Sequence, residues 1–139
     1  MESERAIKAY VASLEQILKS GHLWLKETVE AFQEMVRMVS PERHVPQSRI
    51  VDIRRIHREI QDQLTKIKGV QQLLQGKYRQ HYRRDAVRDK EILEFAFVAK
   101  GCYLRFESVL EQKEAMRRLS ERESLWDRSA TGRAFRWFY

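Results

Sequence analysis

Apolar residues recur at intervals of three and four along most of this 139-residue chain, and this spacing restricts its fold more than any other feature. Such spacing places apolar side chains on one face of an α-helix. One series runs from Ile7 to Val39. A second, from Ile50 to Leu74, is a narrow seam typical of coiled coils and bundles. A third starts at Ile92. The pattern predicts an all-α protein with three long antiparallel helices in an elongated bundle.

Proline and glycine set the expected boundaries of these helices. Pro41 ends the first helix, because the residue before proline avoids the helical conformation, and Gly76 is a typical stop for the second. We therefore predict helices at about 3–39, 48–75 and 78–125, within a single domain of residues 1–126. Gly21 lies on the apolar face of the first helix. The unbroken spacing favours one helix there, and a break at Gly21 would instead give a four-helix variant.

The densest apolar stretch of the chain lies in the third predicted helix. Eleven of the fifteen residues from Ile92 to Phe106 are apolar, and they surround the helix instead of forming one stripe. A helix of this kind is covered on more than one side. We expect it to be the central helix, covered by both other helices or by one of them and a second chain. Its residues outside the main stripe are candidates for a protein interface: Leu93, Phe97, Val98 and Leu104.

The net charge of +7 is concentrated in the middle of the chain, above all between residues 77 and 90. Arginine side chains bind phosphates in a bidentate manner, and tyrosines stack on unpaired bases. The segment is therefore a candidate site for nucleic acid or another acidic partner, and the alternative is an ordinary solvated basic turn. The candidate residues are Lys77, Tyr78, Arg79, Tyr82, Arg83, Arg84 and Arg88.

The last thirteen residues differ in composition from the rest of the chain. Gly132 and a Ser/Thr cluster are expected to end the third helix, which leaves residues 127–139 as an aromatic and basic tail. Aromatic residues and arginine dominate binding hot spots, so the tail either folds back onto the bundle or docks a partner. The tail residues assigned to a protein interface are Phe135, Trp137, Phe138 and Tyr139.

No residue pattern indicates catalysis or a bound cofactor. The single cysteine, Cys102, cannot form an internal disulfide, and no two histidines have the helical spacing of a metal site. We therefore expect no enzyme activity, no cofactor, no metal and no small-molecule substrate. No apolar run is long enough for a membrane span or resembles a secretory signal, which predicts an intracellular, cytoplasmic protein, or a nuclear one in a eukaryote.

These observations favour a small basic helical subunit that acts through protein–protein association, as a scaffold or adaptor in a larger assembly or as a homo-oligomer. The alternative is a subunit of a nucleoprotein complex that contacts the backbone of RNA or single-stranded DNA through residues 77–90.

Overall fold

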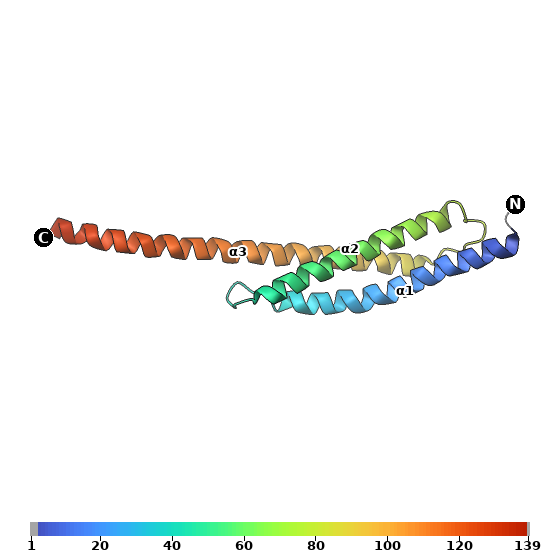
Figure 1. The fold of residues 1–139 in the computed structure, drawn as a ribbon, viewed down its shortest axis with the longest axis horizontal. Coiled ribbons are helices and arrows are strands. Elements are labelled where there is room, and N and C mark those ends of the chain that lie inside the picture. Colours follow the sequence, from blue (N-terminus) through green and yellow to red (C-terminus); the bar gives the residue numbers. More distant parts are fainter. Residues whose placement is uncertain (1–2, 139) are drawn as a thin grey trace.

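The computed structural model describes the backbone of residues 3–138 and the side chains of residues 3–126. It contains three α-helices, α1 (Glu4–Arg37), α2 (Gln47–Gln75) and α3 (Ala86–Phe138), and no strand within these limits. Consecutive helices run antiparallel in an elongated bundle (Figure 1). The predicted all-α fold of three packed helices is confirmed, and the first two predicted helices agree closely with α1 and α2.

Helix α1 is continuous through Gly21, so the four-helix variant is wrong. Gly21 is buried where α2 crosses α1, and a Cβ at this position would lie 2.9 Å from Cδ1 of Ile67 and 2.8 Å from Nε2 of Gln63. The glycine therefore allows a close approach of two helices and does not break one. At the amino end of α1, the Ser3 hydroxyl accepts a hydrogen bond from the amide of Ala6 at 3.1 Å, which caps the helix.

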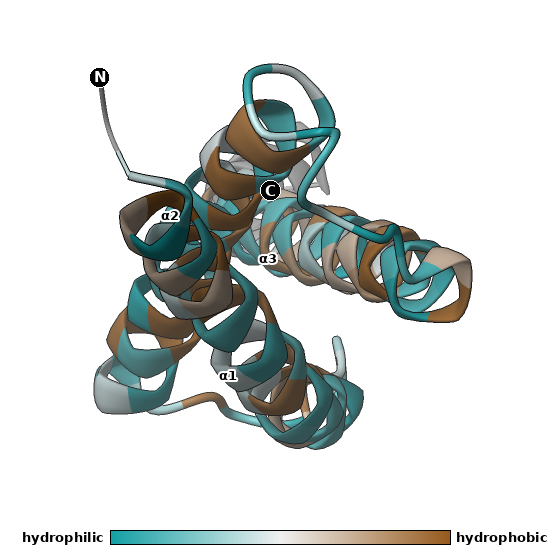
Figure 2. Ribbon diagram, turned by 90° about the vertical axis from the view of Figure 1, so that its right-hand side faces the viewer, coloured by the Kyte–Doolittle hydropathy of each residue, from teal (hydrophilic) through white to brown (hydrophobic). Residues whose placement is uncertain are grey.

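Helix α1 occupies the centre of the bundle. It packs extensively against both α2 and α3, whereas α2 and α3 contact each other little. Hydrophobic residues alternate with hydrophilic ones along all three helices (Figure 2). Burial of each large side chain stabilises the fold by about 1.5–3 kcal/mol. The buried residues of α1 are Val11, Leu14, Leu18, Gly21, Leu25, Val29, Phe32 and Val36.

The expectation that residues 92–106 form the central helix is therefore wrong. α3 lies against α1 through one stripe, in which Ile92, Ala99 and Phe106 are buried. The opposite side of this segment faces solvent. The physical reason is that α1 has a complete apolar stripe along its whole length and bridges the other two helices, so α2 is not available to cover the outer side of α3.

The connection between α2 and α3 differs from the prediction, because α3 begins at Ala86 and not near residue 78. Gly76 ends α2, and its amide donates to the carbonyl of Gln72. The Tyr78 side chain then turns inward, is buried, and meets Tyr10 edge-on with ring centroids 5.3 Å apart. Asp85 caps the new helix by accepting a hydrogen bond from the amide of Arg88 at 3.0 Å.

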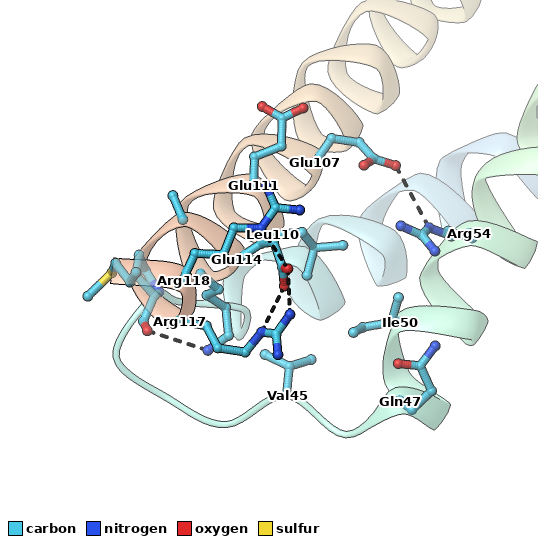
Figure 3. A pocket seen from close by; sticks show the side chains of 14 residues that line it. Val45, Gln47, Ile50, Arg54, Glu107, Leu110, Glu111, Glu114, Arg117 and Arg118 are labelled. Carbon is cyan, nitrogen blue, oxygen red and sulfur yellow. Dashed lines mark hydrogen bonds and ion pairs between the residues drawn. The ribbon is translucent and has the colours of Figure 1, made fainter. Parts of the chain in front are cut away.

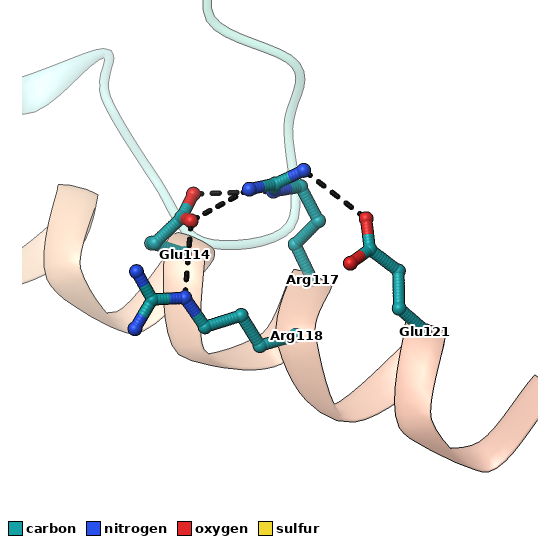
Figure 4. A network of polar contacts seen from close by, with 4 residues as sticks. All are labelled: Glu114, Arg117, Arg118 and Glu121. Atoms are coloured by element: carbon teal, nitrogen blue, oxygen red, sulfur yellow. Dashed lines mark hydrogen bonds and ion pairs between the residues drawn. The ribbon is translucent and has the colours of Figure 1, made fainter. Parts of the chain in front are cut away.

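The carboxyl end of α3 also differs from the prediction. The helix does not stop near residue 125 but continues through Gly132 to Phe138, beyond the other two helices (Figure 1). The residues from Ala115 to Trp126 are all exposed. Helix-favouring residues and local ion pairs support this part: Arg117 bonds Glu114 and Glu121 at 2.7 and 3.1 Å (Figure 4). One glycine costs a helix only about 1 kcal/mol, which such a segment tolerates.

Candidate interaction surfaces

Helix α3 carries two apolar faces on opposite sides. Successive residues turn by about 100° around a helix, so the buried stripe of Ile92, Ala99 and Phe106 lies diametrically opposite Phe97. On that opposite side Leu93, Phe97 and Leu104 are 62%, 76% and 59% exposed. Of the predicted interface residues, Val98 is different, because it is half-buried against the core. We call the exposed stripe the outer face of α3; it consists of Leu93, Phe97, Gly101, Leu104 and Ser108.

Gly101 lies in the middle of the outer face, between Phe97 and Leu104. A Cβ added to Gly101 would meet no atom within 4 Å. Nothing described within the chain therefore requires a glycine here, although glycine costs about 1 kcal/mol relative to alanine inside a helix. A glycine on an apolar helix face lets a second backbone approach closely.

Contacts from both other helices fix the orientation of α3 and thus of its outer face. His22 of α1 lies 2.6 Å from the Glu91 carboxylate, joined through Nε2 and Oε2. Gln71 of α2 donates to Asp89 at 3.0 Å, and Arg54 of α2 forms an ion pair with Glu107 at 3.8 Å. These contacts, together with the buried stripe, hold the outer face away from the bundle.

An aromatic stack around His57 forms the middle of the α2–α3 contact. The His57 and Tyr103 rings are nearly parallel, with an interplanar angle of 4° and centroids 3.6 Å apart, and the centroid of the Phe32 ring of α1 lies 6.2 Å from that of His57. Burial lowers the pKa of His57, and the nearby Glu107 carboxylate opposes this shift. A hydrogen bond to Glu107 raises the pKa of Tyr103. His57 is therefore a packing residue, as its place beside the isoleucine seam suggests.

A groove of about 1010 Å³ opens where α3 leaves the bundle (Figure 3). Its apolar floor is formed by Val45, Ile50 and Leu110, and ionic side chains of α3 and α2 line its rim. At its edge the Lys113 ammonium donates to the carbonyls of Ser40, Pro41 and Arg43, which ties the α1–α2 loop to α3. The sequence does not predict this role of Lys113, because every residue has a backbone carbonyl and its position depends on the tertiary fold.

The structure separates the basic candidates of residues 77–90 into two groups. Tyr78 is buried, and Arg88 is 8% exposed and donates to the Tyr82 hydroxyl at 3.1 Å. Arg84 forms an ion pair at 2.9 Å with Asp89, which is itself buried. Four of the seven candidates therefore take part in the packing or polar contacts of the connection between α2 and α3, and of these Arg84 keeps 64% of its side chain exposed: Tyr78, Tyr82, Arg84 and Arg88.

The remaining candidates of this group, Lys77, Arg79 and Arg83, are exposed. None of the three forms an ion pair with a side chain that the structure describes, although the Lys77 ammonium lies 5.4 Å from the centroid of the Tyr78 ring. This loop therefore presents three exposed cations without an ion-pair partner among the described side chains, which is fewer functional candidates than the sequence predicted.

Cys102 and the other potential ligands form no recognisable reactive site. Cys102 is half-buried against the core, and burial raises the pKa of its thiol, with a smaller opposing effect of Arg105. Within the part of the chain whose side chains are described, no group of three His, Cys, Asp or Glu residues is arranged to hold a metal ion. The side chains of the tail candidates Phe135, Trp137 and Phe138, and Tyr139 as a whole, lie outside the described residues.

None of the described helices combines the length and apolar character that crossing a membrane would require.

Comparison of the chain with protein-family models, with curated proteins and with solved structures gave no match in any of the three.

Proposed function

We propose that this protein is a non-catalytic helical subunit that associates with another protein through the outer face of α3. The observation that carries the proposal is the exposure of Leu93, Phe97 and Leu104 in one line along a well-supported helix. Exposed apolar side chains are common singly, but a contiguous apolar patch on a soluble domain typically marks an interaction site. The solvent-exposed glycine between them is consistent with close packing of a second helix.

The surroundings of this face support a protein partner over a small molecule. The face is a convex helix surface and not a concavity, whereas small ligands bind in clefts that enclose most of their surface. An amphipathic helix of a partner can pack along such a stripe by side-chain interdigitation. Two exposed apolar residues farther along α3, Leu119 and Trp126, lie on the same side of the helix.

Photo-cross-linking tests this function directly. Replacement of Phe97 by benzoylphenylalanine places a photoreactive ring at the centre of the outer face, and the same replacement of Val51 places it at an exposed position of α2 that is 54% accessible. We expect irradiation in living cells to produce a discrete protein adduct from position 97 and none from position 51. Equal adduct patterns from the two positions, or none from position 97, would contradict the proposal.

The exposed cations of the α2–α3 loop support a second proposal, binding of the RNA or single-stranded DNA backbone. Lys77, Arg79 and Arg83 are close in sequence and accessible, and phosphate contacts by such residues give affinity that falls steeply with salt. We expect the triple variant Lys77→Glu, Arg79→Glu, Arg83→Glu to lose binding to a single-stranded oligonucleotide at low salt. The matched control changes to Glu three α2 cations that are likewise exposed and without an ion-pair partner among the described residues: Arg58, Lys66 and Lys68. Equal loss in both variants would show general charge attraction and would contradict a site at this loop.

A further inference from the structure

We propose that the partner of the outer face is a second copy of this chain, whose α3 packs in antiparallel orientation with Phe97 of one copy opposite Leu104 of the other. This inference rests on the proposed function, because it names the occupant of the same surface. It is carried by the apolar stripe, by the charges that flank it and by the position of the rest of the bundle.

The apolar residues of the outer face are self-complementary under a two-fold axis. When Phe97 lies opposite Leu104 of the second copy, the same symmetry places Leu104 opposite Phe97 and Leu93 opposite Ser108. Large and small side chains then alternate across the contact, as interdigitating helices require. The axis passes beside Gly101, where the absence of a side chain permits the closest approach.

Charged residues next to the stripe distinguish the two orientations. In the antiparallel register Lys90 lies opposite Glu111 of the second copy, and Glu94 and Arg105, which share one flank of the helix, face each other across the contact. All four side chains are exposed, and none has an ion-pair partner among the described residues. The two Lys100 side chains come near each other on the opposite flank, and this contact works against pairing.

A parallel arrangement places like charges together at more positions. Each residue of the stripe would face its own counterpart, so Lys90 would meet Lys90 and Glu111 would meet Glu111. On the flanks, Lys100 would lie beside Arg105 of the second copy. Like-charge contacts of this kind set partner orientation in helical pairs. The charge pattern therefore favours the antiparallel arrangement.

The rest of the molecule leaves room for such a pair. Helices α1 and α2 pack on the side of α3 that carries the buried stripe, so the two bundles would lie on opposite sides of the α3 pair. The helices would overlap from Ala86 to Ala115, about 45 Å at 1.5 Å per residue, along a strip about 10 Å wide. Two such strips give roughly 900 Å² before side-chain relief is counted, which is below the roughly 1,200 Å² of stable interfaces and in the range of weak, transient ones. We therefore expect a dimer that dissociates on dilution.

Light scattering on the purified full-length chain measures this directly. We expect twice the chain mass of 16.7 kDa at about 300 μM and the mass of one chain at about 1 μM. Phe97→Asp should remain monomeric throughout with an unchanged far-UV circular dichroism spectrum, because Phe97 makes little contact within its own chain. Val51→Asp, the matched control on α2, should dimerise like the parent. A monomer at every concentration, or a dimer that Phe97→Asp leaves intact, would overturn the inference.

Disulfide trapping determines the orientation. The test uses the double variant Leu93→Cys, Ser108→Cys in a Cys102→Ser background. Only in the antiparallel register does position 93 of one copy face position 108 of the other, so mild oxidation should form a covalent dimer through these two positions. Ser108→Cys alone should stay monomeric under denaturing conditions. Efficient trapping by the single variant would show a parallel pair and would overturn the antiparallel assignment.

The two proposals can fail separately. A purified chain that stays monomeric while position 97 cross-links to a different protein in cells would overturn the second copy as partner and leave the association function in place. The absence of any adduct at position 97 together with a monomeric chain would overturn both.

Discussion

His57 shows how a single side chain acquires a structural role from its neighbours. Its ring stacks on Tyr103 and lies near Phe32, and burial there lowers its pKa and disfavours the charged form. The stack joins all three helices, since one ring comes from each. A neutral imidazole at this position therefore contributes to stability in a way that protonation would reverse.

The pH dependence of stability follows from this pKa. In the unfolded chain His57 titrates near its ordinary pKa of 6.5, whereas the folded value is lower, so the unfolded state binds the proton first as the pH falls. The contribution of neutral His57 to the free energy of unfolding is complete above pH 6.5, and it is lost as the pH falls toward the lower pKa of the folded state. We expect His57→Phe, which keeps the stack, to show a smaller decrease in the free energy of unfolding between about pH 7.5 and pH 5 in urea titrations. An unchanged pH slope in this variant would contradict the assignment.

Two glycines provide a matched pair for testing close packing. A Cβ added at Gly21 would lie within 3 Å of Ile67, whereas one added at Gly69 of α2 would have no atom within 4 Å. Gly69→Ala should raise the free energy of unfolding by up to about 1 kcal/mol through helix propensity. Gly21→Ala should lower the free energy of unfolding by about 1–2 kcal/mol. The added methyl group would overpack against the buried Ile67, and this cost exceeds the gain in helix propensity. Thermal or urea unfolding measures both, and a stabilised Gly21→Ala variant would show that α1 and α2 are not in close contact there.

At the scale of elements, α3 differs from the other helices in how it is stabilised. Its first part is held by packing against α1, whereas from Ala115 to Trp126 it has no buried residue and depends on local interactions. The ion pairs of Arg117 and Arg118 with Glu114 lie at the start of this extension (Figure 4). Such exposed pairs contribute little each, because solvent screens them, and they weaken with salt.

A truncation separates the two parts of α3. A chain that ends after Arg118 keeps the Lys113 contacts to the α1–α2 loop and the ion pairs with Glu114. We expect its helical ellipticity to fall in proportion to the residues removed, while the midpoint of thermal unfolding changes by no more than about 2 °C, since the core is untouched. A large loss of thermal stability would mean that residues beyond 118 contribute to the packing of the bundle.

At the scale of the whole molecule, the bundle is organised around α1 and leaves one helix face without a partner in the chain. The few contacts between α2 and α3 include the Arg54–Glu107 ion pair, the Gln71–Asp89 hydrogen bond and the His57–Tyr103 ring stack. The central position of α1 is what exposes the outer face of α3, so the architecture and the proposed association have the same cause.

Periodicity and breakers in the sequence were sufficient to predict the fold class and the first two helices. An apolar helix face must be covered in the folded protein, so the apolar spacing predicts which residues are buried. This holds for the series from Ile7 to Val39 and for the seam from Ile50 to Leu74. The breakers Pro41 and Gly76 act through the local backbone and need no tertiary information. The sequence also identifies Leu93, Phe97 and Leu104 as apolar residues outside the main stripe of the third helix. Their role in binding stays a prediction.

Only the tertiary structure decided which helix is central and which candidates are accessible. Burial depends on what lies opposite each face, so the same apolar density at residues 92–106 is compatible with a covered helix or a half-exposed one. Arg88 and Tyr78 look like surface ligands in a basic segment, but both are buried, Tyr78 in the loop between α2 and α3 and Arg88 in the first turn of α3. Through local spacing and breakers, the sequence determined that three helices form and where the first two begin and end, whereas both ends of α3 differ from the prediction. The structure decided which of their faces are free, because that depends on contacts between residues far apart in the chain.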